Sequence, residues 1–130
     1  MENKSINAVE AQNGESVEQE PKISIDTFKQ VEMIVGQIKS AERVPDTDKL
    51  LRLVVDLGEA QPRQIVSGIA GFFPDFTVLE GKKCVFVGNL ASRMLRGLES
   101  NGMILAAHSE DGAFALMVPE TDIPVGTRIG

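Results

Sequence analysis

The side chains best suited to binding chemistry gather in one short stretch, "LRGLESNGMILA" at residues 95–106, with a further arginine just before it. Arg93 and Arg96 are permanent cations with several N–H donors, which suits them to phosphate or carboxylate groups. Ser100 and Asn101 add neutral hydrogen-bonding groups, and an apolar run follows directly. The stretch thus joins an anion-binding loop to a strand that must be buried, in a chain whose formal net charge is −6.

The chain lacks the residue sets that catalytic and metal centres require. It has one histidine, His108, and one cysteine, Cys84, so no Cys/His zinc site can be assembled. Neither G-x-S-x-G nor G-x-x-x-x-G-K-[ST] is present. Asp46, Asp48 and Asp56 are interpreted as turn or solvent-facing residues. We therefore expect no catalytic residue, metal or cofactor, with His108 on the surface and Cys84 as a small buried hydrophobe.

The negative charge is concentrated in the N-terminal sixth of the chain. Residues 1–22 hold five acids and two bases, and their net charge of −3 is half of the total. Residues 1–23 are rich in Glu, Gln, Asn and Ser, which predicts a disordered acidic tail or linker, and residues 24–130 are expected to form one domain. The domain is close to neutral, so the placement of its charges in space decides what it attracts.

Cysteine content and hydropathy indicate a cytoplasmic protein without a membrane partner. One cysteine cannot form an internal disulfide, which fits a reducing compartment. No run of about 18 apolar residues is present. The N-terminus "MENKSINAVEAQNGE" shows neither an apolar h-region nor a cleavage pattern.

Apolar periodicity predicts short strands joined by turns, after one short helix. The helix is expected within "SIDTFKQVEM", with Asp26 as its N-cap. Gly36 is interpreted as a bulge or tight bend, and Asp111–Gly112 as a two-residue hairpin turn. Main strands are expected at residues 31–44, 50–58, 63–68, 83–90 and 103–109, with a returning strand at 113–119.

This pattern is typical of an all-β fold, a five-stranded barrel of the OB type with a short flanking helix and a C-terminal extension. Short strands at even spacing favour a closed barrel over a parallel sheet, and closure removes exposed edges. The irregular segment 69–83 is expected to link the third and fourth strands and to have room for a helical turn. Four of the six phenylalanines are expected in the core: Phe72, Phe73, Phe76 and Phe86.

The bases of the domain lie in turns or at strand ends, where loops on a rigid scaffold commonly carry function. Two interpretations are open: these charges keep a small protein soluble, or they bind nucleic acid across one face of the barrel. The chain has no Trp or Tyr, which counts against the recognition of bases by stacking. It is more compatible with recognition of RNA shape and backbone.

Four segments make the domain similar to a known family. In order and spacing, "VGQIKSAERVPDTDKLLRLVVDLG", "RQIVSGIAGFF", "LEGKKCVFVGNL" and "LRGLESNGMILAA" resemble the tRNA-binding domain family. That family includes free-standing tRNA-binding proteins and the C-terminal domain or β-subunit of methionyl-tRNA synthetase. The resemblance covers about residues 28–129, and it implies an OB barrel that binds tRNA by its shape, at the outside of the L.

Within this resemblance, individual positions can be assigned to contacts. The residues predicted to contact phosphate are Lys49, Arg52, Arg93 and Arg96, and those predicted to hydrogen-bond phosphate or 2′-OH groups are Asn89, Ser100 and Asn101. Met103 is predicted either to touch RNA or to close the core, and Ser67 either to touch RNA or to make a structural hydrogen bond. Gly97 and Gly102 are assigned conformational roles.

The resemblance also implies partners. Members of the family commonly dimerise through flanking parts, so a homodimer is expected, with residues 24–32 and 119–130 as interface candidates. The chain is expected to be either a separate tRNA-binding protein or a non-catalytic β-subunit that serves a methionyl-tRNA synthetase catalytic chain. One branch of the superfamily is a peptide-binding secretion chaperone. The segments "PDTDKLL", "SGI", "GNL" and "SNGM" favour the tRNA-binding branch.

Overall fold

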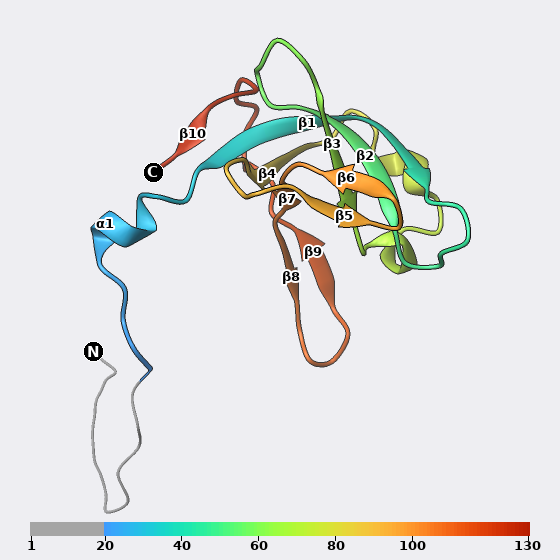
Figure 1. Ribbon diagram of the computed structural model, residues 1–130, viewed down its shortest axis with the longest axis horizontal. Helices are drawn as coiled ribbons and strands as arrows, with labels where there is room; N and C mark the ends of the chain where they lie inside the picture. Colours follow the sequence, from blue (N-terminus) through green and yellow to red (C-terminus); the bar gives the residue numbers. More distant parts are fainter. Residues whose placement is uncertain (1–19) are drawn as a thin grey trace, which may run out of the picture.

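A computed structural model describes residues 20–130, so the acidic tail expected at residues 1–23 lies outside the described residues except for its last four (Figure 1). In chain order the elements are α1 (Ile25–Phe28), β1 (Met33–Arg43), β2 (Leu51–Asp56), β3 (Arg63–Ser67), the 3-10 helices η1 (Ala70–Phe72) and η2 (Phe76–Leu79), β4 (Lys83–Val87), β5 (Arg93–Leu95), β6 (Leu98–Ser100), β7 (Met103–Ile104), β8 (Ala106–His108), β9 (Phe114–Leu116) and β10 (Arg128–Ile129).

The main sheet curls into a nearly closed antiparallel barrel with the strand order β3-β2-β1-β4-β7, and β10 also pairs with β1. The long strand β1 makes the turn of the barrel, because Gln37 is paired both with Asp56 of β2 and with Lys83 of β4. Near the opposite seam, the backbone N–H of Asn101 donates to the Gln64 carbonyl of β3 at 2.8 Å. The predicted all-β, OB-like barrel is confirmed.

The core fills the inside of this barrel, as the alternation of β2 predicts. Leu51, Leu53 and Val55 are completely buried, while the residues between them are half-buried on the outer face. Phe86 of β4 is completely buried as well. Cys84 lies beside it as a small buried hydrophobe, and burial raises the pKa of its thiol to about 11. A thiol with that pKa stays protonated and unreactive at neutral pH.

Gly36 has a packing role that differs from the predicted one. The bulge in β1 lies between Ile38 and Ser40, not at Gly36. A Cβ atom on Gly36 would lie 2.5 Å from Leu57 Cδ2 and 2.8 Å from a ring carbon of Phe86. The glycine is therefore needed because Phe86 packs directly against the β1 backbone, which a sequence pattern does not reveal.

The N-terminal helix is a single turn, shorter than the predicted segment. Its N-cap is Ser24, whose Oγ accepts a hydrogen bond from Thr27 N at 3.1 Å; Asp26 lies inside the first turn instead. No residue of α1 is buried, and Figure 1 shows the helix standing away from the barrel, near β10. The helix is too short to be stable alone, so its surroundings must support it.

The stretch before β7 contains a hairpin that sequence periodicity did not predict. β5 and β6 form their own two-stranded sheet, which lies across the front of β2 and β3 in Figure 1. The strand predicted at 103–109 is divided as a consequence. Its first two residues, Met103 and Ile104, pair with β4, and Ala106–His108 leave the barrel to pair with β9.

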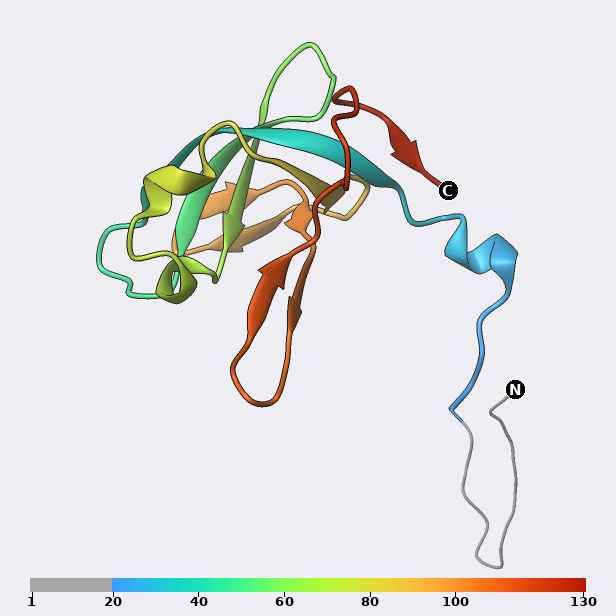
Figure 2. The same cartoon turned by 180° about the vertical axis from the view of Figure 1, so that it is seen from behind.

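The β8–β9 hairpin projects from the barrel (Figure 2), and aromatic contacts of the strand pair nearest its loop hold it against η1. Phe72 of η1 stacks on Phe114 with ring centroids 4.1 Å apart, and the His108 ring meets Phe72 edge-on at 5.1 Å. Phe72 is 39% exposed, so its predicted place in the core is wrong, whereas Phe73 and Phe76 do pack against the core. The hairpin loop spans residues 109–113, longer than the predicted two-residue turn.

Two other expectations are met by the fold. The link between β3 and β4 has room for more than the single helical turn expected, since it holds both η1 and η2. His108 is exposed, as predicted. Among residues 20–130 no helix has the length and apolarity needed to cross a membrane.

Candidate nucleic-acid interface

The tip of the β5–β6 hairpin places an arginine in a backbone conformation that arginine rarely adopts. Leu95 pairs with Leu98, so Arg96 and Gly97 form the two-residue turn, with φ of 51° and 81° respectively. A two-residue turn with both residues at positive φ is the geometry that suits the twist of a β-hairpin, and it favours Asn and Gly. An arginine there costs about 1 kcal/mol relative to glycine. Its side chain is exposed and forms no ion pair within the described part of the chain that would offset this cost.

The hairpin is fastened to β3 by groups that we predicted as ligand contacts. Ser100 is only 3% exposed, and its Oγ accepts a hydrogen bond from Val66 N at 2.9 Å. Asn101 follows with a backbone bond to the Gln64 carbonyl, and its own side chain is half-buried. We therefore assign Ser100 to positioning the hairpin, because its hydroxyl is enclosed. The Asn101 amide stays available at the edge of a hollow of about 550 Å³.

Lys49 and Arg96 are brought together although they are 47 positions apart in the sequence. Both line a shallow hollow of about 440 Å³, with Asp46 and Asp48 on the same wall. The Lys49 carbonyl accepts a hydrogen bond from Ala70 N, which ties the loop between β1 and β2 to the start of η1. Because the formal charge of the hollow is balanced, its cations would act on a phosphate through direct hydrogen bonds rather than through a net positive potential.

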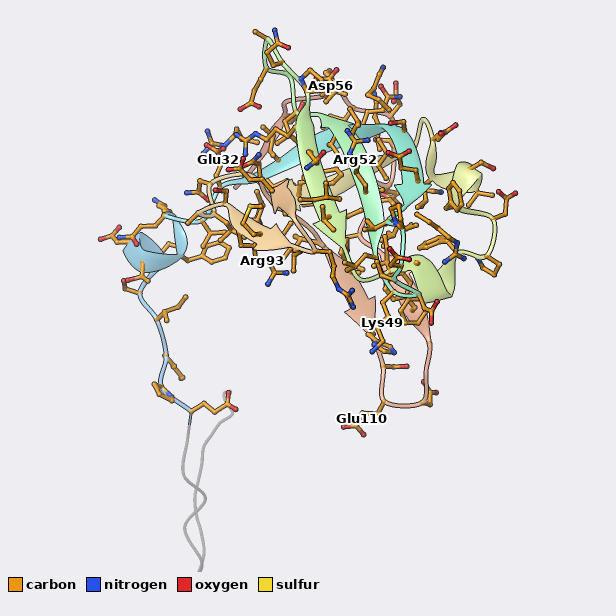
Figure 3. The ribbon with its side chains drawn as sticks, turned by 45° about the vertical axis from the view of Figure 1, so that its right-hand side comes forward. Glu32, Lys49, Arg52, Asp56, Arg93 and Glu110 are labelled. Carbon is orange, nitrogen blue, oxygen red and sulfur yellow. The ribbon has the colours of Figure 1, made fainter. Side chains whose placement is uncertain are left out.

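Arg93 lies beside a third and larger hollow, of about 700 Å³. Met103 is 45% exposed on its rim, together with Leu90, and Ser67 also lines it. Met103 thus does not close the core. The hollow combines an arginine with exposed apolar side chains and backbone from β7. Figure 3 shows Arg93 on the hairpin and Lys49 at the far end of β2 from Asp56.

Arg52 lies on the outer face of β2, and its charge is paired. Its Nη1 donates to Glu42 Oε2 at 2.6 Å, and its Nε donates to Gln64 Oε1 at 2.6 Å. The guanidinium is therefore held in one orientation. Lys49, Arg93 and Arg96, in contrast, have no acidic partner within 4.0 Å anywhere in residues 20–130.

Asn89 uses both ends of its amide to hold the N-terminal segment. Its Oδ1 accepts from Glu32 N at 2.8 Å, and its Nδ2 donates to the Gln30 carbonyl at 2.5 Å. These bonds tie the end of β4 to the chain between α1 and β1. These bonds fix the orientation of the amide and leave only one of its N–H groups for the predicted contact with RNA, so we assign Asn89 to positioning.

Arg63 is a central residue of this face whose role the sequence did not reveal. Its guanidinium pairs with Glu59 at 2.7 Å and donates to the Gly88 carbonyl at 2.5 Å and the Asn101 carbonyl at 3.3 Å. It therefore joins the β2–β3 loop, the end of β4 and the end of the hairpin. The i, i+4 spacing of Glu59 and Arg63 was the only signal, and it is weak outside a helix.

The Glu59–Arg63 pair leads to a pH-dependent prediction. The hydrogen bond from Arg63 holds the pKa of Glu59 below its ordinary value of 4.5. A lowered pKa in the folded state means that the stabilisation is complete above the ordinary value and is lost as pH falls through the folded value. We expect Glu59→Gln to lower the free energy of unfolding at pH 7 by about 0.5 kcal/mol, as for a partly exposed ion pair. The deficit should shrink between about pH 5 and pH 3, measured by urea unfolding. A constant deficit over this range would contradict the assignment.

No three His, Cys, Asp or Glu side chains in residues 20–130 are grouped closely enough to hold a metal ion. What this face offers is a set of exposed cations, amide groups and apolar side chains. They are carried on a hairpin and loops over a rigid small barrel. Exposed cations with neutral hydrogen-bonding groups and a methionine beside them, on a small barrel, are typical of a nucleic-acid-binding barrel.

The chain belongs to the putative tRNA-binding domain family, whose profile matches residues 33–128. It is 44% identical to a methionine–tRNA ligase of Archaeoglobus fulgidus over 118 residues, which are 89% of this chain and 17% of that protein. It is 48% identical to the methionine–tRNA ligase of Methanospirillum hungatei over 122 residues, 93% of this chain and 18% of that protein. The chain thus spans less than a fifth of the length of these relatives.

Solved structures support the same family. A methionyl-tRNA synthetase related protein from Pyrococcus horikoshii aligns with a TM-score of 0.78 and 40% identity, over 85% of this chain and 100% of that one. The chaperone CsaA of Bacillus anthracis aligns with a TM-score of 0.74 and 25% identity, with 85% and 100% of the two chains covered. The barrel is therefore shared by proteins with different names and uses. The function of this chain has to be argued from the residues of its site and not from the fold.

Proposed function

We propose that this protein is a non-catalytic module that binds tRNA through the shape and backbone of the RNA. The observation that carries the proposal is Arg96. It occupies a turn position where Gly or Asn would be less strained, and its side chain extends, exposed, into a hollow shared with Lys49. Backbone strain at an exposed cation is expected where the side chain serves a ligand.

The proposed contacts come from three parts of the barrel: the start of β2, the β5–β6 hairpin and the start of β7. Lys49, Arg93 and Arg96 contact phosphates, and Arg52 contacts one with the N–H groups that Glu42 and Gln64 leave free. Asn101 donates to phosphate or 2′-OH groups, and Met103 packs on a ribose or base. Ser100 and Asn89 support these contacts indirectly. With few phosphates engaged, affinity is modest and depends strongly on salt.

The experiment is a comparison of ligands for the full chain. We expect tighter binding to an unmodified tRNA transcript than to a DNA duplex with the same number of phosphates, and equal binding of two tRNAs that differ only in the anticodon. Equal binding of all polyanions would contradict shape recognition. Competition by unfolded peptide would instead favour a chaperone role, which the similarity to CsaA makes the second candidate.

The protein is also proposed to be a homodimer. Support comes from apolar side chains around α1 that the described chain does not cover: Ile23, Ile25, Phe28, Val31 and Ile129 are each at least 38% exposed. All five lie in or directly beside the flanking segments 24–32 and 119–130. A second copy of the chain would bury them.

Sedimentation tests the dimer. We expect particles of twice the 14.1 kDa chain mass, and a shift to monomers in Ile25→Lys. Val78→Lys is the matched control, because Val78 is 56% exposed on η2, outside the proposed interface. Monomers in the wild type at all concentrations would refute the dimer.

The biological setting is proposed from the relatives. The named relatives are methionine–tRNA ligases that carry this domain within a much longer chain. We infer that this protein acts in the cytoplasm, either as a separate tRNA-binding protein or beside a methionyl-tRNA synthetase catalytic chain. Co-purification with the synthetase would establish the second, and its absence with retained tRNA binding would establish the first.

A further inference from the structure

Gln64 connects the two cationic parts of the proposed RNA-binding face. It lies on the outer face of β3, opposite Val54 of β2. Its Oε1 accepts from Arg52 Nε at 2.6 Å, and its Nε2 donates to the Glu99 carbonyl of β6 at 2.8 Å. One side chain thus bridges an arginine of the barrel wall and the hairpin that carries Arg93 and Arg96.

Only a neutral amide can make this bridge. Its oxygen has to face a guanidinium donor while its NH₂ group faces a carbonyl acceptor. A glutamate at this position could accept from Arg52, but its second oxygen would face the Glu99 carbonyl, and its charge would oppose an approaching phosphate. A hydrocarbon side chain would make neither bond. Gln64 orients Arg52 without adding negative charge to the face, whereas Glu42, the other partner of Arg52, adds one.

The hairpin needs this support because it is small. Each of its strands has three residues, and a two-stranded hairpin of that size is marginally stable by itself. Four polar contacts join it to β3: the Gln64 side chain to the Glu99 carbonyl, Asn101 N to the Gln64 carbonyl, Val66 N to Ser100 Oγ, and Arg63 Nη1 to the Asn101 carbonyl. Among them, the Gln64 side chain supplies the contact that also reaches Arg52, so it couples the position of the hairpin to the orientation of that arginine.

We propose that Gln64 is a positioning residue for RNA binding, which holds Arg52 and the β5–β6 hairpin in one arrangement that matches neighbouring phosphates. The proposal rests on the proposed function and deepens it. Through Gln64, the phosphate contact of Arg52 and those of the hairpin arginines become parts of one site. Loss of the amide leaves all the cations in the chain and removes their common geometry.

The test is a double-mutant cycle with Gln64→Met and Arg52→Met, read as tRNA affinity at several salt concentrations. Methionine keeps the length of the side chain and removes its hydrogen bonds. We expect Gln64→Met to weaken tRNA binding about fivefold and to make the salt dependence shallower, although no charge has been removed. In the Arg52→Met background the same change should have a clearly smaller effect. The matched control is Gln37→Met, since Gln37 also loses a side-chain hydrogen bond, from its Nε2 to the Gly81 carbonyl at 3.0 Å, but lines none of the hollows around the proposed contacts.

A second readout is independent of RNA. In the wild type the Arg52 Nε–H NMR signal should be shifted and protected from exchange, and Gln64→Met should abolish both effects while thermal unfolding shows that the fold is retained. Equal effects of Gln64→Met in the two backgrounds, or an unchanged affinity and salt slope, would overturn the positioning role. If loss of Arg93 and Arg96 also leaves tRNA binding unchanged, it is the proposed function that fails instead.

Discussion

Replacing Arg96 by asparagine is expected to stabilise the protein and to weaken tRNA binding at the same time. Asparagine tolerates the positive φ of 51° at this turn better than arginine, so the free energy of unfolding should rise by up to about 1 kcal/mol. The substitution also removes a charge-assisted hydrogen bond to phosphate, which should lower affinity about tenfold at low salt. Opposite signs for stability and binding cannot be explained by misfolding.

The salt dependence identifies the kind of contact that is lost. The slope of log K against log salt should become shallower by about 0.7–0.9 for each cation removed, so Arg96→Asn with Arg93→Gln should change it about twice as much as Arg96→Asn alone. Affinity for tRNA would be measured by fluorescence anisotropy and stability by urea unfolding.

Lys82→Gln is the matched control for the arginines. Lys82 is an exposed cation that lines a different hollow, with Phe72 and Phe114. It should have little effect on the affinity for tRNA. An equal loss of affinity for Lys82→Gln would indicate a diffuse electrostatic effect, and an unchanged slope in the double variant would remove the hairpin arginines from the interface.

Phe86→Ala is expected to have the largest effect on stability. Phe86 is completely buried, and its ring packs against the β1 backbone at Gly36. The loss of a phenylalanine side chain from a core lowers the free energy of unfolding by about 3–5 kcal/mol, from lost burial and from the cavity left behind. For a domain of this size the thermal midpoint should fall by more than about 10 °C.

A second substitution at Gly36 tests the packing contact itself. In the wild type, Gly36→Ala should destabilise by about 1–3 kcal/mol, because the added methyl group meets Phe86 and Leu57. In the Phe86→Ala background the new cavity accommodates the methyl group and gives the Leu57 side chain room to move away from it, so the effect of Gly36→Ala should be smaller. Val78→Ala, at a site that is 56% exposed, is the control and should change stability little. Additive effects of Gly36→Ala and Phe86→Ala would contradict the proposed contact.

The two largest predictions separate the two regions of the molecule. Arg96 acts on the ligand and not on the core, while Phe86 acts on the core without touching the proposed interface. A substitution of Gln64 has a third kind of effect, since it changes the geometry of the cations and leaves their charge unchanged. A set of variants at these positions can therefore distinguish loss of fold, loss of charge and loss of arrangement.

The sequence by itself determined the barrel. Alternation over β2 and turn residues between the strands indicated an all-β core, because period-2 burial is the pattern of a strand with one face inside. Motif order was enough to place the chain in its family, with the profile matching residues 33–128. The positions of the arginines in the sequence also indicated one place where cations gather, because Arg93 and Arg96 lie close together in one loop segment.

Only the tertiary structure decided what each polar side chain does. Ser100 and Asn89 look like ligand contacts in the sequence, yet register and strand packing place them against Val66 and Glu32. Arg63 and Gln64 begin the segment "RQIVSGIAGFF", but the sequence does not show what they bind, since these partners are distant in sequence and meet them only when β3, β4 and β6 come together. Hydrogen-bond partners depend on angstrom-scale placement across strands, which local patterns do not encode.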